Sequence, residues 1–343
     1  MADALGLEEV RRALAEDRAR EDVTTRLLGA LAERPAAARF IAEGRFVVAG
    51  MAVAALGFRE LDPCAEFDAL VADGGWVETG ATLATVRASA RAVLGGERVA
   101  LNFLQRLSGI ATLTRRAVDA VAGTGARITH TRKTTPGLRA LERYAVRIGG
   151  GVENRASLGD AVLWKDNHWA LLAAQGKTLA QALAAAPAGV PVVVEVESDE
   201  QLEAALAAGV THILADNQPP ERIAAWARQV GPAVTLQASG GISPDAARPY
   251  AVAGASLIAI GALTHSASAA PIRLDVAPTP APSGVLNRSG HHLLGGGFVG
   301  SLRPTHSLGP GSISHRAPLR RSITALAHHM QRSHPFLRDC RNC

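Results

Sequence analysis

The sequence has few cysteines and no long apolar run, and both absences narrow the class of protein. Its 343 residues include three cysteines, Cys64, Cys340 and Cys343, which are too few and too scattered for a disulfide framework. No run of about 18 apolar residues predicts a membrane span, and the first residues show no signal-peptide pattern. We therefore expect a cytoplasmic protein without a membrane partner.

Lysine is also scarce. The chain has 36 Lys and Arg residues, but only Lys133, Lys165 and Lys177 are lysines. Because arginine fills the other cationic positions, a lysine indicates a need for a compact ammonium group whose pKa can shift. Lys133 and Lys165 each follow an apolar, strand-like run and are candidates for a site. Lys177 precedes a predicted helix and is interpreted as a solvated surface charge.

The net charge of +5 comes from one end of the chain. Residues 277–343 contain eight arginines and one acidic residue, so they carry 8 − 1 = +7 and the rest carries 5 − 7 = −2. A body without excess positive charge argues against nucleic-acid binding. The segment 277–343, rich in Gly, Ser, Pro and His, is predicted to be a disordered, low-complexity basic tail. A shifted reading frame or read-through would produce the same abrupt change in composition.

Hydrophobic periodicity predicts an α/β protein. Residues 4–32 have a helical pattern, and residues 37–95 alternate in short strands punctuated by glycine. A long helix is expected over 97–121, where apolar residues recur at helical spacing. Over 126–265 about six strand-like runs alternate with helical runs. These strands are continuous in Val, Ile and Leu, as in a parallel sheet covered on both faces.

The predicted fold class is α/β, with two domains and a tail. An N-terminal mixed α/β sandwich domain is expected over 1–107. An incomplete parallel α/β barrel is expected over 108–276, with its final strand returning to the N-terminal domain. The tail follows over 277–343. In barrels of this kind the functional site lies at the C-terminal ends of the strands.

The residues at these strand ends segregate by charge along the chain. The earlier strands end in cations, which are Arg132, Lys133 and Lys165, and the middle strands end in carboxylates, Glu195 and Asp216. The last two strands end in small residues whose backbone N–H groups can approach a phosphate, namely Ser239, Gly240, Gly241, Gly261 and Ala262. This set suits substrates that carry several anionic groups, hydroxyls and a terminal phosphate.

Several motifs resemble those of the quinolinate phosphoribosyltransferase family, also called carboxylating nicotinate-nucleotide pyrophosphorylases. They are TRKTTPGLR at 131–139, GGG at 149–151 followed by Arg155, LWKDNH at 163–168, EVE at 195–197, ADN at 215–217, ASGGI at 238–242 and GALTHS at 261–266. AEDRAREDVTT and ERVALNFLQRLSGIAT, nearer the N-terminus, match too. The resemblance covers roughly residues 5–275 in the expected order, which makes it more specific than a single motif.

The resemblance implies a reaction and a binding mode for one substrate. Family members transfer ribose 5-phosphate from phosphoribosyl pyrophosphate to the ring nitrogen of quinolinate and release CO₂, giving nicotinate mononucleotide. By the family pattern, Arg132, Arg155 and Lys165 face the two carboxylates of quinolinate, with Asn154 beside them. Arg98 is expected to reach the site from the neighbouring subunit of a homodimer.

The resemblance also implies how the phosphoribosyl donor and Mg²⁺ are held. Lys133 pairs with the phosphates of the donor, while Glu195 and Asp216 bind the ribose hydroxyls and Mg²⁺. The backbone at Ser239, Gly240 and Gly241 and at Gly261 and Ala262 cradles the 5-phosphate. The predicted catalytic residues are Lys133, Lys165, Glu195 and Asp216.

The sequence departs from the family pattern near the predicted site. Where the family usually has Asn-His-Arg, this chain has Glu153, Asn154 and Arg155. A carboxylate at Glu153 would repel a dianion unless it points away or pairs with Arg155. Three further departures are Ser157 for glycine, Gln237 for glutamate and His130 for aspartate.

Other interpretations remain open from the sequence alone. A related phosphoribosyltransferase acting on another acidic ring, or an inactive barrel serving as a binding protein, would share much of this pattern. Lys133 and Lys165 could also be structural partners of barrel carboxylates. His168 and His265 are interpreted as structural or lysine-orienting residues rather than ligands.

Overall fold

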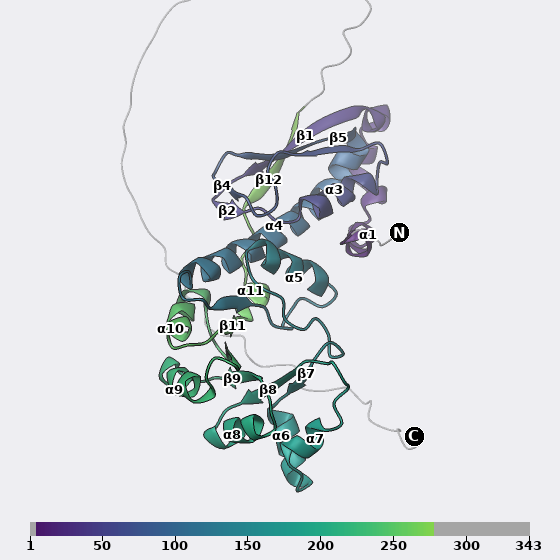
Figure 1. The fold of residues 1–343 in the computed structure, drawn as a ribbon. Helices are drawn as coiled ribbons and strands as arrows, with labels where there is room; N and C mark the ends of the chain where they lie inside the picture. The colour runs from purple at the N-terminus through teal and green to yellow at the C-terminus, as the bar shows by residue number, and fades with distance from the viewer. Residues whose placement is uncertain (1–4, 278–343) are drawn as a thin grey trace, which may run out of the picture. The chain divides into compact units, whose positions relative to one another are not determined.

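A computed structural model describes residues 5–277, in which the long helix α4 (Ala90–Ala120) lies between two main sheets (Figure 1). The predicted tail beyond Ala277 lies outside the described residues. The helix begins at Ala90 rather than at the expected residue 97, because the Ser89 hydroxyl accepts the Ala92 N–H (3.4 Å) and caps the first turn. It runs unbroken through residues 107 and 108, where the sequence places a domain boundary.

The N-terminal part contains a four-stranded antiparallel sheet in the order β12-β1-β5-β3. Its strands are β1 (Pro35–Ala42), β3 (Glu66–Ala69), β5 (Thr82–Ser89) and β12 (Ile272–Ala277). A small sheet pairs β2 (Phe46–Val47) with β4 (Trp76–Val77). The helical elements are α1 (Leu7–Glu16), η1 (Ala19–Glu21), α2 (Val23–Arg26), η2 (Gly29–Glu33) and α3 (Met51–Arg59).

The N-terminal elements differ from the sequence predictions in two places. The helical pattern over 4–32 is divided into short helices, because Arg18 adopts a left-handed backbone (φ 50°) and Asp22 starts a new helix by accepting the N–H groups of Thr24 and Thr25. Helix α3 lies in a stretch that was predicted to contain only strands. Most of its residues are buried, so no polar stripe marks its helical period.

The second sheet has six parallel strands in the order β6-β11-β10-β9-β8-β7. The strands are β6 (Arg127–Thr129), β7 (Val162–Trp164), β8 (Val192–Val196), β9 (His212–Asp216), β10 (Thr235–Ser239) and β11 (Leu257–Ala259). The connecting helices are α5 (Arg139–Ile148), α6 (Asp166–Ala174), α7 (Leu179–Leu183), α8 (Asp199–Ala207), α9 (Pro220–Val230), η3 (Pro244–Ala246), α10 (Ala247–Val252) and α11 (Ala262–His265).

This sheet confirms the predicted incomplete barrel. Within residues 5–277, its end strands β6 and β7 do not pair with each other, and the free edge of β6 instead bonds Val152 through Val152 N–H and Ile128 O (2.8 Å). The chain then returns to the N-terminal sheet as predicted. Strand β12 pairs with β1 from Ala42↔Ile272 to Ala37↔Ala277. Because every barrel strand runs the same way, all six C-terminal ends lie on one side.

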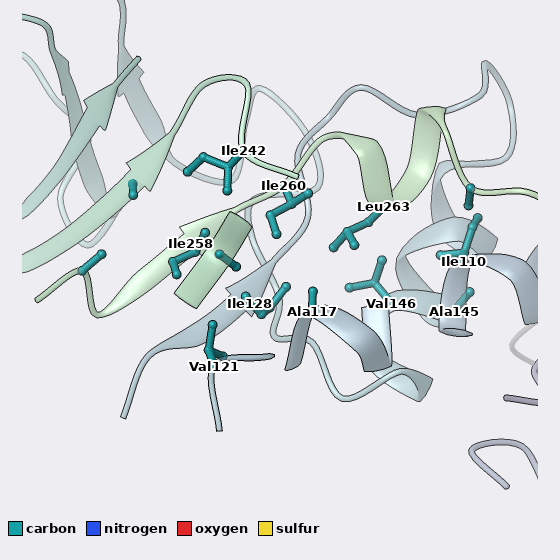
Figure 2. Packing of buried hydrophobic residues seen from close by; sticks show 14 of the residues in the cluster. Ile110, Ala117, Val121, Ile128, Ala145, Val146, Ile242, Ile258, Ile260 and Leu263 are labelled. Atoms are coloured by element: carbon teal, nitrogen blue, oxygen red, sulfur yellow. The ribbon is translucent and has the colours of Figure 1, made fainter. Parts of the chain in front are cut away.

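Two hydrophobic cores meet at α4, which contributes to both. Leu101 and Leu104 pack under the N-terminal sheet, whereas Phe103 and Leu107 belong to the core that continues into the barrel. Figure 2 shows part of the barrel core, where Ile110 and Ala117 of α4 and Val146 of α5 lie near Leu263 of α11 and Ile128 of β6. The long helix therefore sets the position of the barrel strand ends. No helix within residues 5–277 is long and apolar enough to cross a membrane.

Candidate active site

The C-terminal ends of the barrel strands surround a cavity of about 590 Å³. Eight of the residues predicted for the site line it, namely Arg132, Lys133, Asn154, Arg155, Lys165, Glu195, Asp216 and Ser239. Thr131, Glu153, Asp160, His212 and Gln237 also line it, together with apolar residues such as Leu163, Val193 and Leu214. The cavity is thus lined by both apolar and charged side chains.

Lys165 and Glu195 form an ion pair at the ends of the neighbouring strands β7 and β8. Lys165 follows β7 and is the N-cap of α6, where its N–H donates to Nδ1 of His168 (3.0 Å). Its ammonium donates to both oxygens of Glu195 (2.9 and 2.7 Å). Burial raises the pKa of Glu195, and Lys165 opposes that rise. The Trp169 indole also fixes this strand end by donating to Glu195 O (2.8 Å).

The guanidinium groups of Arg132 and Arg155 add positive charge to the wall of the cavity. Arg132 Nε is buried and has no hydrogen-bond partner among the described residues. Arg155 donates to Ala161 O (3.1 Å). Burial and then the charge of Arg132 lower the pKa of Arg155, although a guanidinium stays protonated in proteins. Two cations, one of which has a buried donor without a partner within residues 5–277, are chemically suited to an anion.

Lys133 follows Arg132 in the loop after β6 and lies beside the last barrel turn. Its carbonyl accepts the Thr264 hydroxyl (2.8 Å), and its N–H donates to Thr131 Oγ1 (3.1 Å). A Cβ on Gly261 would lie 3.3 Å from Lys133 Cδ and 3.1 Å from His265 Nε2. The lysine, the histidine and the Gly261 backbone therefore converge. The sequence had assigned His265 no ligand role, because a single histidine in a turn carries no spatial information.

The loop after Asp216 packs closely against the loop after Ser239. Asn217 adopts a left-handed backbone (φ 54°) and its side-chain amide donates to Asp216 Oδ2 (2.7 Å). Gly240 has φ +95°, and a Cβ there would contact Asn217 Oδ1 and lie 2.5 Å from Asn217 N. Only glycine fits that position. The backbone after Ser239 is thereby held next to the carboxylate of Asp216.

The three glycines before Glu153 have a packing role. A Cβ on Gly149 would lie 2.6 Å from Ala111 O of α4, and a Cβ on Gly151 would lie 2.6 Å from Val146 Cγ1 of α5. Gly150 has φ +95°. This turn brings the segment 152–155 against β6, where Asn154 and Arg155 reach the cavity.

The negative charge of Glu153 is balanced by side chains that lie outside the cavity. Its carboxylate accepts from Arg143 Nε (3.0 Å) and pairs with Arg147 (3.1 Å), and His130 Nε2 lies 3.2 Å away. The sequence left open that Glu153 points away or pairs with Arg155, and within residues 5–277 its carboxylate pairs with Arg143 and Arg147 instead. Burial raises the pKa of Glu153, but the hydrogen bonds from Arg143 and His130 outweigh it and leave the pKa lowered. Glu153 therefore remains ionised and is matched by positive charge.

Asn154, the residue that replaces the family histidine, is engaged at both ends of its amide. Its Nδ2 donates to His130 O (3.1 Å), and its Oδ1 accepts the Arg155 N–H (2.8 Å). The His130 side chain is almost fully buried, and its Nε2 lies 3.2 Å from the backbone nitrogen of Asn154. Asn154 and His130 thus shape the backbone that presents Arg155.

A neutral pair lies deeper in the barrel. His212 Nε2 donates to Gln237 Oε1 (2.9 Å), and both residues line the cavity. Burial lowers the pKa of His212, so the ring is uncharged near neutral pH. The sequence marked Gln237 as a departure but gave no signal for its partner on the neighbouring strand.

The structure does not bring every predicted residue to the cavity wall. Gly240, Gly241, Gly261 and Ala262 lie in the turns beyond it and do not line it directly. Arg98 is exposed on α4, in the N-terminal part. Within the described residues, the barrel cavity is therefore built without Arg98.

Two family models match nearly the whole of the described chain. The model for the N-terminal domain of quinolinate phosphoribosyl transferase matches residues 22–108, and that for its C-terminal domain matches residues 110–275. The chain belongs to the quinolinate phosphoribosyltransferase family. Both domains of the family are present in order, on the fold that the structure shows.

Named relatives and solved structures agree with this assignment. Nicotinate-nucleotide pyrophosphorylase [carboxylating] of Mycobacterium leprae is 46% identical over 235 residues, which cover 67% of this chain and 82% of that protein. The probable enzyme of the same name from Bacillus subtilis is 39% identical over 261 residues, or 76% and 90% of the two chains. A crystal structure of a NadC deletion mutant has a TM-score of 0.75 and 35% identity and covers 81% of this chain and 99% of that one.

Proposed function

We propose that this protein transfers the phosphoribosyl group of phosphoribosyl pyrophosphate to quinolinate, giving nicotinate mononucleotide, pyrophosphate and CO₂ in NAD biosynthesis. The observation that carries the proposal is the cationic wall of the cavity, where the buried Arg132 Nε has no hydrogen-bond partner in the described part of the chain and lies near Arg155. Such a wall suits a ligand with two adjacent carboxylates. Family membership and the named relatives support the same activity.

The quinolinate dianion would occupy the part of the cavity bounded by Arg132, Arg155 and Lys165. Arginine forks bind carboxylates through two parallel hydrogen bonds, and Lys165 supplies a compact third charge. Because Lys165 is paired with Glu195 before substrate binds, a carboxylate of quinolinate would share this ammonium with the protein carboxylate.

The phosphoribosyl donor would lie between Lys133 and the carboxylates of Glu195 and Asp216. Lys133 would contact its phosphates, and the carboxylates would accept hydrogen bonds from the ribose hydroxyls. The turns at 239–241 and 261–262 would present backbone N–H groups to the 5-phosphate. The left-handed Gly240 and Gly241 favour such an anion-binding concavity.

Mg²⁺ fits this site as an ion shared with the donor. Within residues 5–277 no three His, Cys, Asp or Glu side chains come together in a way that would hold a metal ion alone. Glu195 and Asp216 could supply two carboxylate ligands, and Mg²⁺ commonly takes its remaining ligands from water and substrate phosphates. When bound, Mg²⁺ would neutralise charge on the departing pyrophosphate.

The side chains favour a displacement at the anomeric carbon without a general base. Positive charge develops at that carbon as its bond to pyrophosphate breaks, and Glu195 and Asp216 stabilise that charge. The ring nitrogen of quinolinate attacks with its own lone pair. The C2–carboxylate bond then breaks and CO₂ leaves. Its electron pair stays on C2 beside the cationic ring nitrogen until C2 takes up a proton.

A homodimer would bring Arg98 to the cavity of the partner subunit. Arg98 is exposed on the same face of α4 as Leu94, which is 37% exposed. The neighbouring α2–η2 segment exposes Leu27, Leu28 and Leu31 and packs against α4. Exposed apolar side chains grouped in this way are typical of an interface. Cys64 is exposed and forms no disulfide within residues 5–277, which is compatible with a reducing compartment such as the cytoplasm.

Steady-state assays of pyrophosphate and CO₂ release test the proposed activity. Quinolinate with phosphoribosyl pyrophosphate and Mg²⁺ should yield both products in equal amounts. Nicotinate has one carboxylate and would leave cavity cations unmatched, so its kcat/KM should be at least about a hundredfold lower. A preference for nicotinate or another acidic ring would contradict the quinolinate assignment. Absence of turnover together with tight binding would instead favour a binding protein.

A further inference from the structure

Arg106 on α4 lies outside the cavity, yet its guanidinium joins several segments that surround it. It donates to Glu142 Oε1 (2.8 Å), to Ala267 O (3.1 Å) and to Thr135 Oγ1 (3.4 Å). It also donates to Thr264 O. The same side chain therefore contacts α5, the loop after β6 and the end of the last barrel turn.

The first of these connections fixes the loop 131–137, which carries Arg132 and Lys133. Glu142 is fully buried, and it accepts both the N–H (3.1 Å) and the hydroxyl (2.8 Å) of Thr135. Burying a carboxylate is costly unless a cation pairs with it. Arg106 supplies that cation, so the anchor at Thr135 depends on it.

The second connection fixes the segment 261–267, which contains the last phosphate-facing turn. Arg106 holds the carbonyls of Thr264 and Ala267. The Thr264 hydroxyl donates to Lys133 O (2.8 Å) and lies 3.1 Å from Gly261 O. Thr264 is fully buried. The loop of Lys133 and the turn of Gly261 are thereby joined through one threonine that Arg106 holds in place.

We propose that Arg106 is a positioning residue for the phosphoribosyl donor. It locks the loop 131–137 to the segment 261–267, so that the Lys133 ammonium and the Gly261 turn face the same phosphates. The inference rests on the proposed function for the identity of the ligand. A guanidinium is required because its planar fork reaches a carboxylate and two carbonyls at once, whereas a lysine ammonium is a single point charge.

Arg106→Lys keeps the charge beside Glu142 but loses the fork. We expect KM for phosphoribosyl pyrophosphate to rise about tenfold, below the roughly hundredfold cost of a fully misplaced group. KM for quinolinate should rise less than KM for phosphoribosyl pyrophosphate, because Arg155 and Lys165 lie outside the two joined segments and only Arg132 shares the loop with Lys133. Thr264→Val, which removes the hydroxyl bond to Lys133 O, should reproduce the same selective rise.

The matched control is Arg116→Lys on the same helix. Arg116 pairs with Asp245 at 3.2 Å on an exposed surface, so both KM values should stay at the wild-type level. Equal rises in both KM values for Arg106→Lys would indicate a general structural role and overturn the inference. Unchanged KM values for Arg106→Lys and Thr264→Val would overturn it as well.

Hydrogen exchange without substrate separates this inference from the proposed function. Arg106→Lys should speed amide exchange in 131–137 and 261–267 and leave β8 and β9 at the wild-type rate, because only the two joined segments lose their anchor. If wild type fails to turn over quinolinate, the proposed function fails, and the exchange result still decides the coupling. Wild-type exchange in both segments would refute the coupling whatever the activity.

Discussion

Lys165 shows how one side chain sets the charge of the cavity. Its ammonium pairs with a Glu195 that is 5% exposed, so each group limits the cost of burying the other. The sequence left open that the lysines are structural partners of barrel carboxylates, and Lys165 does pair with such a carboxylate. It does not exclude a catalytic role, because the pair lines the cavity at its cationic wall.

Replacing either cavity lysine should abolish most of the turnover. Lys165→Ala and Lys133→Ala should each lower kcat/KM by at least about a hundredfold, the usual cost of losing a preorganised electrostatic contact. The third lysine provides the control, because Lys177 is exposed and Lys177→Ala should retain wild-type kinetics. Circular dichroism would establish that each variant is folded. Wild-type kinetics in a folded Lys133 or Lys165 variant would return that lysine to a structural role.

Glu153 shows how a residue can depart from a family pattern without spoiling a site. Arg143 and Arg147 lie on α5, outside the cavity, and both pair with the Glu153 carboxylate. His130 approaches it from β6. These three partners balance the negative charge of the Glu153 carboxylate. The quinolinate dianion that we propose for the cavity would therefore contact Arg155 without facing an unpaired carboxylate.

This cluster predicts a pH-dependent stability. The folded-state pKa of Glu153 is below its ordinary value of 4.5, so its pairing stabilises the protein above about pH 4.5 and is lost as pH falls through the lowered pKa. Glu153→Gln should therefore lower Tm at pH 7, and the difference from wild type should shrink below pH 4.5. Calorimetry over pH 3–7 measures both.

The surface pair of Glu66 with Arg87, at 4.0 Å, offers the control for that experiment. Glu66→Gln should change Tm little at any pH, because exposed ion pairs contribute about 0–1 kcal/mol. A Tm difference for Glu153→Gln that stays constant down to pH 3 would show that Glu153 acts through packing rather than charge.

At the scale of elements, the late barrel turns rely on left-handed glycines. The turn after β10 holds Gly240 and Gly241 at φ +95° and +61°. Gly240 also packs against Asn217 of the turn after β9. The conformation of each turn therefore constrains the other, and the backbone proposed for phosphate binding depends on both.

Gly240→Ala should disrupt this pair of turns. An added Cβ would lie 2.5 Å from Asn217 N, so the backbone must move. KM for phosphoribosyl pyrophosphate should rise at least about tenfold, since a shift near 1 Å can cost more than that. Gly176→Ala is the matched control. Gly176 has φ +62° with nothing within 4 Å of its added Cβ, so only about 1–2 kcal/mol of backbone strain is expected. Equal KM values for both variants would contradict the phosphate role of the turn.

At the scale of the whole molecule, the proposed homodimer would share each active site between two subunits. Arg98 lies outside the barrel of its own chain, on a helix face that also exposes Leu94. A two-fold interface would place each Arg98 in the partner's cavity. Each complete site would then combine the N-terminal part of one chain with the barrel of the other.

Mixing two inactive variants tests this sharing. After subunit exchange, Arg98→Ala with Lys133→Ala should regain part of the activity, because one site of each mixed dimer would contain both intact residues. Lys133→Ala mixed with Lys165→Ala is the control. Both lysines line the same cavity, so that mixture should stay inactive. No recovery in the first mixture, with exchange verified by mass, would refute a shared site.

The sequence by itself determined the alternation of strands and helices over 126–265 and the order of charged residues at the strand ends. Both are local properties. Buried parallel strands are continuous in apolar residues, and the residue after each strand must lie at the C-terminal edge of the sheet. The sequence therefore predicted that Lys165 lies at such an edge. It did not predict helix α6, which follows Lys165, because DNHWALLAA lacks a clear helical period.

The tertiary structure alone decided which side chains meet. Arg106 and Glu142 are 36 residues apart, and Lys165 and Glu195 are 30 apart, so neither pair leaves a local pattern in the chain. Glu153 found partners on α5 because the turn at 149–151 packs against α4 and α5. Periodicity records which face of an element is buried. The approach of two polar groups from different elements depends on how those faces pack, and that is settled only in the folded chain.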